Sequence, residues 1–544
     1  MRLALLVGLA LTSVPAVSAV AEVPGTANEV PGTANEVPAI AVEAALDKAF
    51  TAFWHADDAP QREAAIQTVL ATGASFESIW ARLEAGRPYS ADVDTGRIDL
   101  SHKTKDKTRH HFRVLVPKDY DPAKRYPVHF YLHGGVSRPA WRKGGAWWSN
   151  YDRFESPDRI SVFPSSWDAS MWWSRRQAEN LPAILERLKH TYNVDENRVH
   201  LFGISDGATG AYFFAFRDPT PWASFLPFIG HPAVLDNRRL GVDGEMYPRN
   251  LAARPFFVVN GGQDRLYPAA RVLPYLDLMQ RAGTEVVFRH FPEGGHDTRW
   301  WPDEVDNIRA FLQSHPRDPL PEQLTWQTET SERYQRNAWL LITTLGPTER
   351  DQPLDDFNSL RYPPSLGFRP DPESSGGVRV DKVYNDSVAD QAGLEKGDRI
   401  VAAAGTPTST IEQLSQVIAT HGGWGTTLPA AVERRGERLE LTFQTPQSPP
   451  PDELTPAFQH RLPSGRIELS RRGNRIEVQS ERVRRFKLLL SPLEIDFDQP
   501  LTVITNGEVS FDGRLELDAR TLLEWAARDT DRTMLFAAEL ELDV

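Results

Sequence analysis

The chain has 544 residues, of which 40% are hydrophobic, and its formal net charge is −13. This length exceeds what a single hydrophobic core usually organises, so we expect several domains. The sequence contains no cysteine, which excludes disulfides and a lipid anchor on cysteine, and the acidic balance gives no electrostatic reason to expect a nucleic-acid partner.

The N-terminal sequence has the composition of a targeting segment followed by a tether. Residues 1–21 place one arginine before an apolar run that ends in small residues, which is typical of an export signal peptide. A buried N-terminal helix is the alternative for this segment. Residues 22–38 repeat EVPGTAN twice and begin it a third time, and the Pro-Gly in each unit favours a linker over a helix. No later stretch reaches the roughly 18 apolar residues of a membrane span, so we expect an exported protein, periplasmic or secreted, without a transmembrane span.

Residues 39–90 and residues 91–318 differ in periodicity. In residues 39–90 apolar residues recur at helical spacing, which predicts a small helical cap or spacer without a site of its own. In residues 91–318 short apolar strands alternate with amphipathic helices, which predicts an α/β domain with a doubly wound, mostly parallel sheet. One strand, in the segment YPVHFYLHGG, is apolar almost throughout, as expected of a strand buried on both faces.

Three strands of the α/β domain end in loops that carry Ser205, Asp264 and His296 in turn. The first runs into GISDG, and the glycines two residues before and after Ser205 relieve the crowding of a sharp strand-to-helix turn. The other two strands run into GGQD and PEGGH. Because the carboxyl ends of parallel strands meet at one edge of a sheet, we expect the three side chains to lie close together.

These three residue types suit nucleophilic catalysis. Ser205 would attack an acyl carbon, His296 would take its proton, and Asp264 would hold the imidazole. An ordinary turn serine is the alternative for Ser205, and a helix-capping aspartate is the alternative for Asp264. Asp297 is disfavoured as the acid because it adjoins His296 in sequence, and His290, inside its strand, is interpreted as a packed histidine.

The HGG turn after YPVHFYL and the residue after the serine supply candidate oxyanion donors. Glycines let backbone amides approach an anionic oxygen closely, so we assign the backbone amides of Gly134, Gly135 and Asp206 to this role. A plain tight turn is the alternative for the two glycines. We expect His133 to shape the turn rather than to titrate.

The motifs YLHGG, VHLFGISDG, VVNGGQDRLYP and FPEGGH together resemble α/β-hydrolase serine esterases. The resemblance covers about residues 95–315 and extends to polyhydroxybutyrate depolymerases, feruloyl esterases and the catalytic domain of prolyl oligopeptidases. It implies a Ser-His-Asp triad that cleaves esters or peptides with no cofactor, neither metal nor nucleotide. Ala208 departs from the pattern, because many relatives have a second glycine there. The sequence shows no recognisable peptidase propeller, which weakens the oligopeptidase branch.

Tryptophans follow the HGG turn, the next strand and His296. The indole face suits sugars, phenolic acyl groups and polymers, so we predict a small or polymeric ester substrate held against an aromatic rim. The rim residues assigned to substrate binding are Trp147, Trp148, Trp172 and Trp300. A core position is the alternative for each of them, since tryptophan is also a common core residue.

The C-terminal half combines a second module with β-rich sequence. Residues 319–348 contain two strand-like pieces that cannot be stable alone, and we predict that they join the β-rich domain of residues 457–544. Between these segments, residues 361–445 resemble a PDZ domain of the kind attached to bacterial exported proteases, and a Pro-rich linker follows at 446–456.

The PDZ resemblance rests on SLGF, GVRVDKV, SVADQAGLEKGDRIVAAAG and TIEQLSQVIAT. It implies that the loop of Ser365, Leu366, Gly367 and Phe368 receives the terminal carboxylate of a peptide, while the peptide pairs as an added strand. A structural spacer or a self-docking module is the alternative.

The leading hypothesis is an exported serine hydrolase that cleaves carboxylic esters. The alternatives are a peptidase of prolyl-oligopeptidase type and a non-catalytic peptide- or glycan-binding protein on a hydrolase scaffold. The expected partners are the substrate and a peptide C-terminus, with no nucleic acid.

Overall fold

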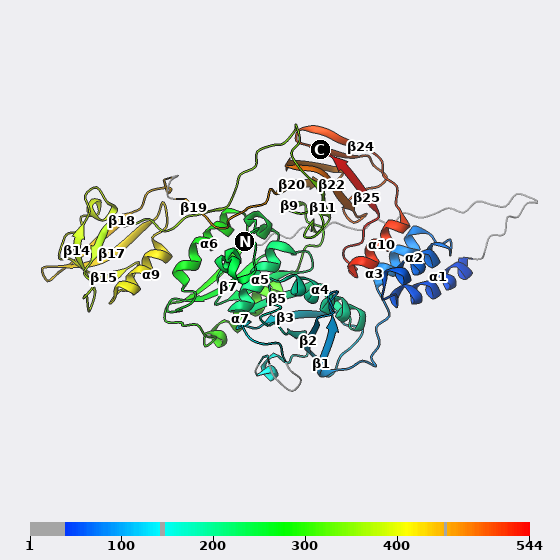
Figure 1. Ribbon diagram of the computed structural model, residues 1–544, viewed down its shortest axis with the longest axis horizontal. Helices are drawn as coiled ribbons and strands as arrows, with labels where there is room; N and C mark the ends of the chain where they lie inside the picture. Colours follow the sequence, from blue (N-terminus) through cyan, green and yellow to red (C-terminus); the bar gives the residue numbers. More distant parts are fainter. Residues whose placement is uncertain (1–38, 142–146, 149, 451–453) are drawn as a thin grey trace, which may run out of the picture.

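A computed structural model describes residues 39–141, 147–148, 150–450 and 454–544. The predicted signal peptide at 1–21 and the repeat linker at 22–38 lie outside the described residues. The chain forms a central α/β domain with a β-sandwich beside it, and two smaller units lie at opposite ends of the molecule (Figure 1). One is a helical unit, and the other is the inserted module, residues 361–445. No helix in the described ranges is long and apolar enough to cross a bilayer.

The α/β domain is built on an eight-stranded mixed sheet. The hairpin of β1 and β2 pairs antiparallel with β4, and the remaining strands run parallel to one another. In spatial order the strands are β1 (Gly96–Lys103), β2 (Arg109–Val116), β4 (Ile160–Pro164), β3 (Tyr126–Leu132), β5 (Val194–Ile204), β6 (Ser224–Phe228), β7 (Phe256–Gly261) and β8 (Val286–Phe291).

Helices cover both faces of this sheet, as a doubly wound fold requires. α4, α5 and α6 pack with Phe130 in one core, whereas α7 and η1 pack with Tyr131 on the other face. Phe130 and Tyr131 are successive residues of β3, so their side chains point to opposite faces, and both are buried. The helices of the domain are α4 (Arg175–Thr191), α5 (Asp206–Arg217), α6 (Ala269–Arg281) and α7 (Trp301–Ser314), with short 3₁₀ turns η1 (Tyr151–Phe154), η2 (Pro232–Asp236), η3 (Arg238–Leu240) and η4 (Pro248–Ala253).

The β-sandwich is assembled from two distant parts of the chain. β9 pairs with β20, and β11 pairs with β22, so the strands at 319–348 join the strands at 457–544, the pairing expected from the sequence. One sheet has the order β24 (Glu508–Gly513), β23 (Leu501–Thr505), β21 (Arg475–Glu481), β20 (Gly465–Arg472) and β9 (Gln323–Thr328). The other has the order β10 (Arg336–Asn337), β11 (Leu340–Leu345), β22 (Val483–Leu490) and β25 (Ala538–Asp543).

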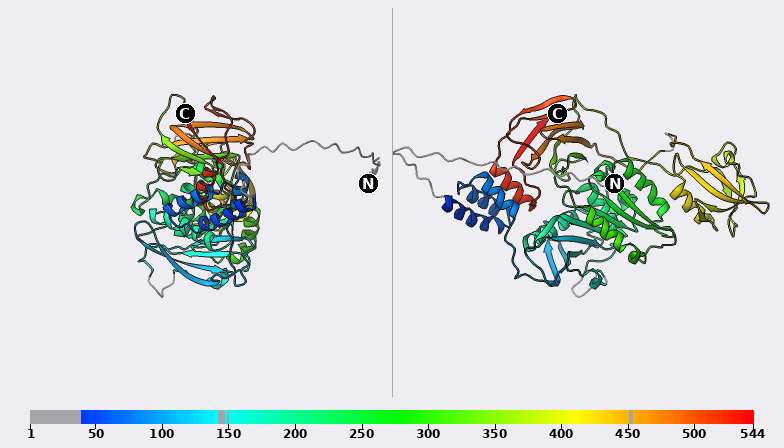
Figure 2. Two further views of the ribbon diagram at one scale, coloured as in Figure 1. Left: turned by 90° about the vertical axis from the view of Figure 1, so that its right-hand side faces the viewer. Right: turned by 180° about the vertical axis from the view of Figure 1, so that it is seen from behind.

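The N-terminal helices share a core with a helix from the other end of the chain. Leu46 and Ile66 are buried in one cluster with Leu522 and Leu523, and Figure 2 shows the N-terminal helices beside the C-terminal one. The predicted helical character is present, and the unit has a partner that the sequence did not suggest. Its helices are α1 (Ala39–Trp54), α2 (Ala59–Leu70), α3 (Phe76–Ala85) and α10 (Ala519–Asp529).

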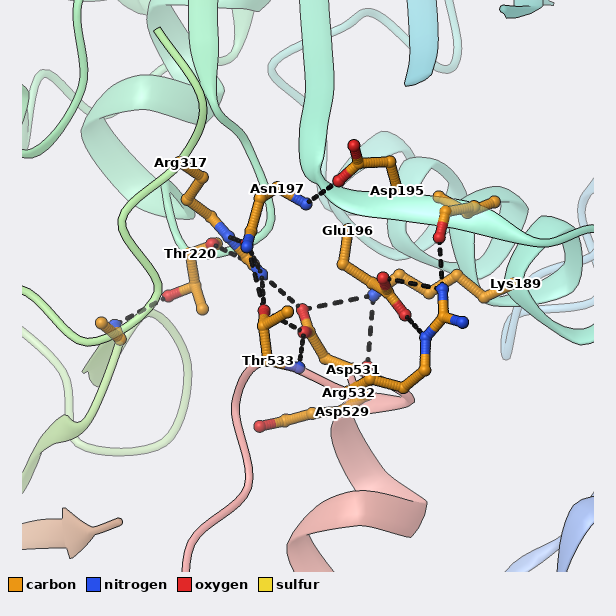
Figure 3. Close-up of polar contacts among 12 residues, drawn as sticks. Lys189, Asp195, Glu196, Asn197, Thr220, Arg317, Asp529, Asp531, Arg532 and Thr533 are labelled. Atoms are coloured by element: carbon orange, nitrogen blue, oxygen red, sulfur yellow. Dashed lines mark hydrogen bonds and ion pairs between the residues drawn. The ribbon is translucent and has the colours of Figure 1, made fainter. Parts of the chain in front are cut away.

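A buried ion network joins the segment after α10 to the α/β domain (Figure 3). The Asp531 carboxylate accepts a hydrogen bond of 2.7 Å from Arg317 and lies 3.6 Å from Lys189, and Arg532 pairs with Glu196 at 2.6 Å. Burial alone would raise the pKa of Asp531, but the charges of Arg317 and Lys189 outweigh it and hold that pKa below its usual range. The network therefore fixes the end of α10 against α4 and β5.

The inserted module stands on a two-stranded neck, in which β12 (Ser359–Leu360) pairs with β19 (Thr455–Pro456). Its helix α9 lies beside α6 of the α/β domain (Figure 1), and Gln416 Nε2 donates a 2.6 Å hydrogen bond to the carbonyl oxygen of Gly262. Its elements are β13 (Phe368–Pro370), β14 (Val378–Val383), α8 (Val388–Gln391), β15 (Arg399–Ala403), β16 (Thr406–Pro407), α9 (Ile411–His421), β17 (Thr427–Arg434) and β18 (Glu437–Gln444).

Candidate active site

Ser205 occupies a strained turn between β5 and α5. Its φ of 56° and ψ of −117° are unusual for a residue with a side chain. The turn has no room for side chains on its flanks. A Cβ atom at Gly203 would lie 2.0 Å from the carbonyl oxygen of Gly207, and one at Gly207 would lie 2.0 Å from that of Leu132. Both glycines of the GISDG motif are therefore required by close backbone packing.

Ser205, His296 and Asp264 form a continuous hydrogen-bonded chain. His296 Nε2 lies 2.9 Å from Ser205 Oγ, and His296 Nδ1 lies 2.8 Å from Asp264 Oδ2. Asp264 is buried, and its Oδ1 accepts hydrogen bonds from the backbone amides of Leu266 and Tyr267. Because the carboxylate accepts the Nδ1–H of His296, Nε2 can accept the serine proton. The structure thus brings together the three residues predicted for the triad.

The neighbouring acid and the other histidine of this region have structural roles. Asp297 binds Arg299 at 2.7 Å, and this hydrogen bond lowers the pKa of Asp297. His290 lies in β8 with its ring stacked on Phe288, and burial lowers its pKa. Asp264 does cap the turn that follows it, through Oδ1, but its other oxygen holds the imidazole.

The HGG turn lies directly against the nucleophile. A Cβ atom at Gly134 would lie 2.9 Å from Ser205 Cβ and 3.5 Å from its Oγ. Gly135 has a φ of 65°, in the left-handed region that favours glycine. The amide of Val136 donates a hydrogen bond to Oδ2 of Asp206 at 2.9 Å. Gly134 therefore lies against Ser205, and Asp206, the residue after the nucleophile, is hydrogen-bonded to the residue that follows Gly135.

His133 shapes this turn, as expected from the sequence. Burial lowers its pKa to about 3, so the ring is neutral at ordinary pH. Its Nε2 accepts a hydrogen bond of 3.0 Å from the amide of Ser166, and its carbonyl oxygen accepts one of 2.8 Å from the indole of Trp172.

Three of the four tryptophans predicted to contact substrate are buried instead. Trp147, Trp172 and Trp300 are 6%, 0% and 4% exposed, respectively. A buried indole needs a partner for its N–H, and each of the three donates to a backbone carbonyl oxygen. The prediction of a substrate-facing rim is therefore wrong for these residues, which belong to the core around the site.

The fourth, Trp148, is half-buried and lines a small apolar pocket beside the triad. Ile204 and Thr298 line the same pocket, and they lie one residue before Ser205 and two residues after His296. The space inside, about 10 Å³, accommodates about one water molecule. An acyl chain would need movement of the aromatic walls to enter it.

Tyr267 is a neighbour of the triad that sequence reasoning missed. Its ring packs edge-on against His296, with 5.7 Å between ring centroids. Burial raises its pKa, and the charges of Asp206 and Asp264 raise it further, so the hydroxyl stays protonated. Its only signal in the sequence is its position three residues after the acid. No group of three His, Asp or Glu side chains among the described residues is arranged to hold a metal ion.

The strand order β1-β2-β4-β3-β5-β6-β7-β8, with the serine in the turn from β5 to α5, is that of the α/β-hydrolase fold. Among similar solved structures is a thermostable esterase, at 19% identity and a TM-score of 0.33, matched over 41% of this chain and 63% of the esterase. The acylaminoacyl peptidase of Pyrococcus horikoshii matches at 16% identity and a TM-score of 0.33, over 41% of each chain. A ferulic acid esterase matches at 19% identity and a TM-score of 0.31, over 41% of this chain and 99% of its own. No curated protein shows significant sequence similarity to the chain.

The inserted module contains a PDZ domain, whose family model matches residues 379–424. The loop predicted to bind a carboxylate precedes the matched region and runs into β13. Leu366 of this loop is buried, and Gly367 has a φ of 79° with its Cβ position only 2.2 Å from Ser387 Cβ. β13 is an edge strand of its sheet, so an extended peptide can add to its outer edge.

Proposed function

We propose that the protein is a serine hydrolase that cleaves carboxylic esters through an acyl-enzyme. The observation that carries this proposal is the hydrogen-bonded chain from Asp264 through His296 to Ser205, with distances of 2.8 Å and 2.9 Å. Ser205 Oγ attacks the acyl carbon while His296 Nε2 takes its proton, and Asp264 stabilises the imidazolium. His296 then gives the proton to the leaving alcohol. A water molecule attacks the acyl-enzyme in the same way, with His296 as the base, and releases the carboxylic acid.

The HGG turn stabilises the oxyanion formed at each attack. In this proposal the backbone amides of Gly134, Gly135 and Asp206 donate to the oxyanion, and the position of Gly134 against Ser205 supports the assignment. Each such donor contributes about 3–4 kcal/mol in comparable sites. The glycines serve this role because a side chain at Gly134 would contact the nucleophile itself.

Amide cleavage by the same triad and a binding function without catalysis are the alternatives. A fluorophosphonate probe should label the wild-type protein and leave Ser205→Ala unlabelled. A wild-type protein that stays unlabelled would favour the binding function. Hydrolysis rates on an ester and an amide with the same acyl group then separate an esterase from a peptidase, and a faster amide reaction would contradict the ester assignment.

The PDZ domain binds the C-terminus of a peptide in this proposal. The loop Ser365–Phe368 receives the carboxylate and the peptide pairs with β13. Binding of a fluorescent peptide with a free C-terminus, compared with the same peptide amidated, tests this role. Equal affinity for both would favour a spacer or self-docking module.

Export of the chain is also part of the proposal, and it rests on residues 1–21. N-terminal sequencing of the protein recovered from cell fractions should find a chain that begins after Ala19 or Ala21. An unprocessed chain in the cytoplasm would contradict it.

A further inference from the structure

The carboxylate of Asp206 binds a residue outside its own helix. Asp206 is the first residue of α5, directly after the nucleophile, and its Oδ2 accepts a 2.9 Å hydrogen bond from the amide of Val136. Val136 follows the HGG turn and is only 1% exposed. The contact therefore joins two segments that lie 70 residues apart in sequence, at the point where both meet Ser205.

The turn is anchored at its other end as well. The carbonyl oxygen of His133 accepts a hydrogen bond from the Trp172 indole, and its ring accepts one from the amide of Ser166. Gly134 and Gly135 lie between the two anchors and have no side chains to hold them by packing. Because glycine has more conformational freedom than any other residue, the position of their amides depends on the anchors.

We propose that the side chain of Asp206 is a positioning residue, which sets the oxyanion-binding amides of the HGG turn against Ser205. This inference rests on the proposed hydrolase function. A hydrogen bond from an amide to a carboxylate is roughly twice as strong as one between neutral groups. The negative charge is also favoured at the N-terminus of α5 by the helix dipole.

A negative charge beside an oxyanion would oppose catalysis if nothing balanced it. Arg138 supplies the balancing charge, because it interacts electrostatically with Asp206 and its Nη2 lies 3.4 Å from the carbonyl oxygen of Gly134 in the same turn. Burial lowers the pKa of Arg138, and the nearby charge of Asp206 opposes that shift. The carboxylate can therefore hold the turn while the guanidinium offsets its charge.

Two substitutions separate the hydrogen bond from the charge. Asp206→Ala removes the acceptor, whereas Asp206→Asn keeps an oxygen that can accept from Val136. With p-nitrophenyl butyrate as substrate, we expect Asp206→Ala to lower kcat about 10- to 100-fold with little change in KM, because oxyanion donors act in the transition state. Asp206→Asn should recover most of this loss. A trifluoromethyl ketone, which forms a tetrahedral adduct with serine, should bind Asp206→Ala more weakly by the same factor as the loss in kcat.

Asp303→Ala is the matched control, because Asp303 is an exposed acid in the first turn of α7. It should leave kcat and KM unchanged. If Asp206 served only the dipole of its helix, the Asn variant would lose as much activity as the Ala variant, and that result would overturn the inference. If the Ala variant does not fold, Asp206→Glu carries the test, because it keeps the charge but displaces the acceptor. A Glu variant with wild-type kcat would then overturn the inference.

The failure of the inference is distinct from failure of the proposed function. A wild-type protein that reacts with neither the fluorophosphonate nor the ester would overturn both. An active wild type whose Asp206→Ala variant keeps its kcat would overturn the inference alone.

Discussion

Asp264→Asn is the most direct test of how the triad is held. Asp264 Oδ1 accepts two backbone hydrogen bonds, from Leu266 and Tyr267, so an asparagine must place its carbonyl oxygen there. Its NH₂ group then points at His296 Nδ1. Since this group is a donor, it forces the imidazole proton onto Nε2, and Nε2 can no longer accept the proton of Ser205.

We expect the loss to be severe although the shape of the site is unchanged. In a Ser-His-Asp triad this substitution lowers kcat by about 10⁴-fold, which corresponds to about 5.5 kcal/mol of transition-state stabilisation. The assay is steady-state hydrolysis of p-nitrophenyl butyrate together with the rate of fluorophosphonate labelling. Asp297→Asn is the matched control, because that carboxylate binds Arg299 and not the imidazole. An Asp264→Asn protein that keeps kcat within about tenfold of the wild type would refute the tautomer argument.

Three further substitutions test contacts of the HGG turn, the Asp531 network and the PDZ domain. Trp172→Phe removes the indole donor to the HGG turn, so we expect about 1 kcal/mol lower unfolding free energy, with kcat reduced and KM preserved. Asp531→Asn leaves Arg317 buried without its counter-charge and should cost about 3–5 kcal/mol in urea unfolding. Because the pKa of Asp531 is lowered in the folded state, this stability is present above the unfolded carboxyl pKa and is lost as the pH falls below it. Gln416→Ala removes the contact between the PDZ domain and Gly262, and should increase hydrogen exchange in the loop that carries the catalytic acid.

Each of these has a control on the same chain. Trp424→Phe loses an indole hydrogen bond inside the inserted module, to the carbonyl oxygen of Tyr362. It should keep wild-type kcat, so an equal loss in both Trp variants would contradict the specific role. Asp306→Asn breaks an exposed ion pair and should change stability by less than about 0.5 kcal/mol. Gln413→Ala removes a contact within the PDZ domain. Increased hydrogen exchange in the loop of Asp264 in that variant would contradict the bridging role of Gln416.

The triad could be predicted because its signals are local. Each of the three residues follows an apolar strand, and the elbow needs glycine at fixed positions for steric reasons that any such turn shares. The carboxyl ends of parallel strands then bring Ser205, Asp264 and His296 to one edge without further information.

The tryptophans could not be placed in this way. Trp172 is buried because it packs in the core of the α/β domain and donates its N–H to the carbonyl oxygen of His133, and neither neighbour is visible in the local sequence. The same holds for the network of Asp531, whose charged partners Arg317 and Lys189 lie more than 200 residues away in sequence. The contact of the Asp206 side chain could not be predicted for a related reason, since its partner comes from the turn after a different strand.

The position of the PDZ domain follows from how the β-sandwich is built. The end of β11 and the start of β20 lie together, because a Cβ atom at Gly465 would lie 2.7 Å from Leu345 Cδ2. The chain between them therefore leaves and returns at the same place, and the paired strands β12 and β19 form that neck. The neck is tied to α6, where Arg281 donates to the carbonyl oxygen of Ser359 and Tyr275 donates to that of Ala457. The PDZ domain is thus held by two strands against α6, the helix that follows the loop of Asp264. It can move far less than a domain attached through a single linker. Its helix α9 is therefore kept beside the loop of Asp264 by the architecture of the sandwich, and the hydrogen bond to Gly262 sets the final orientation.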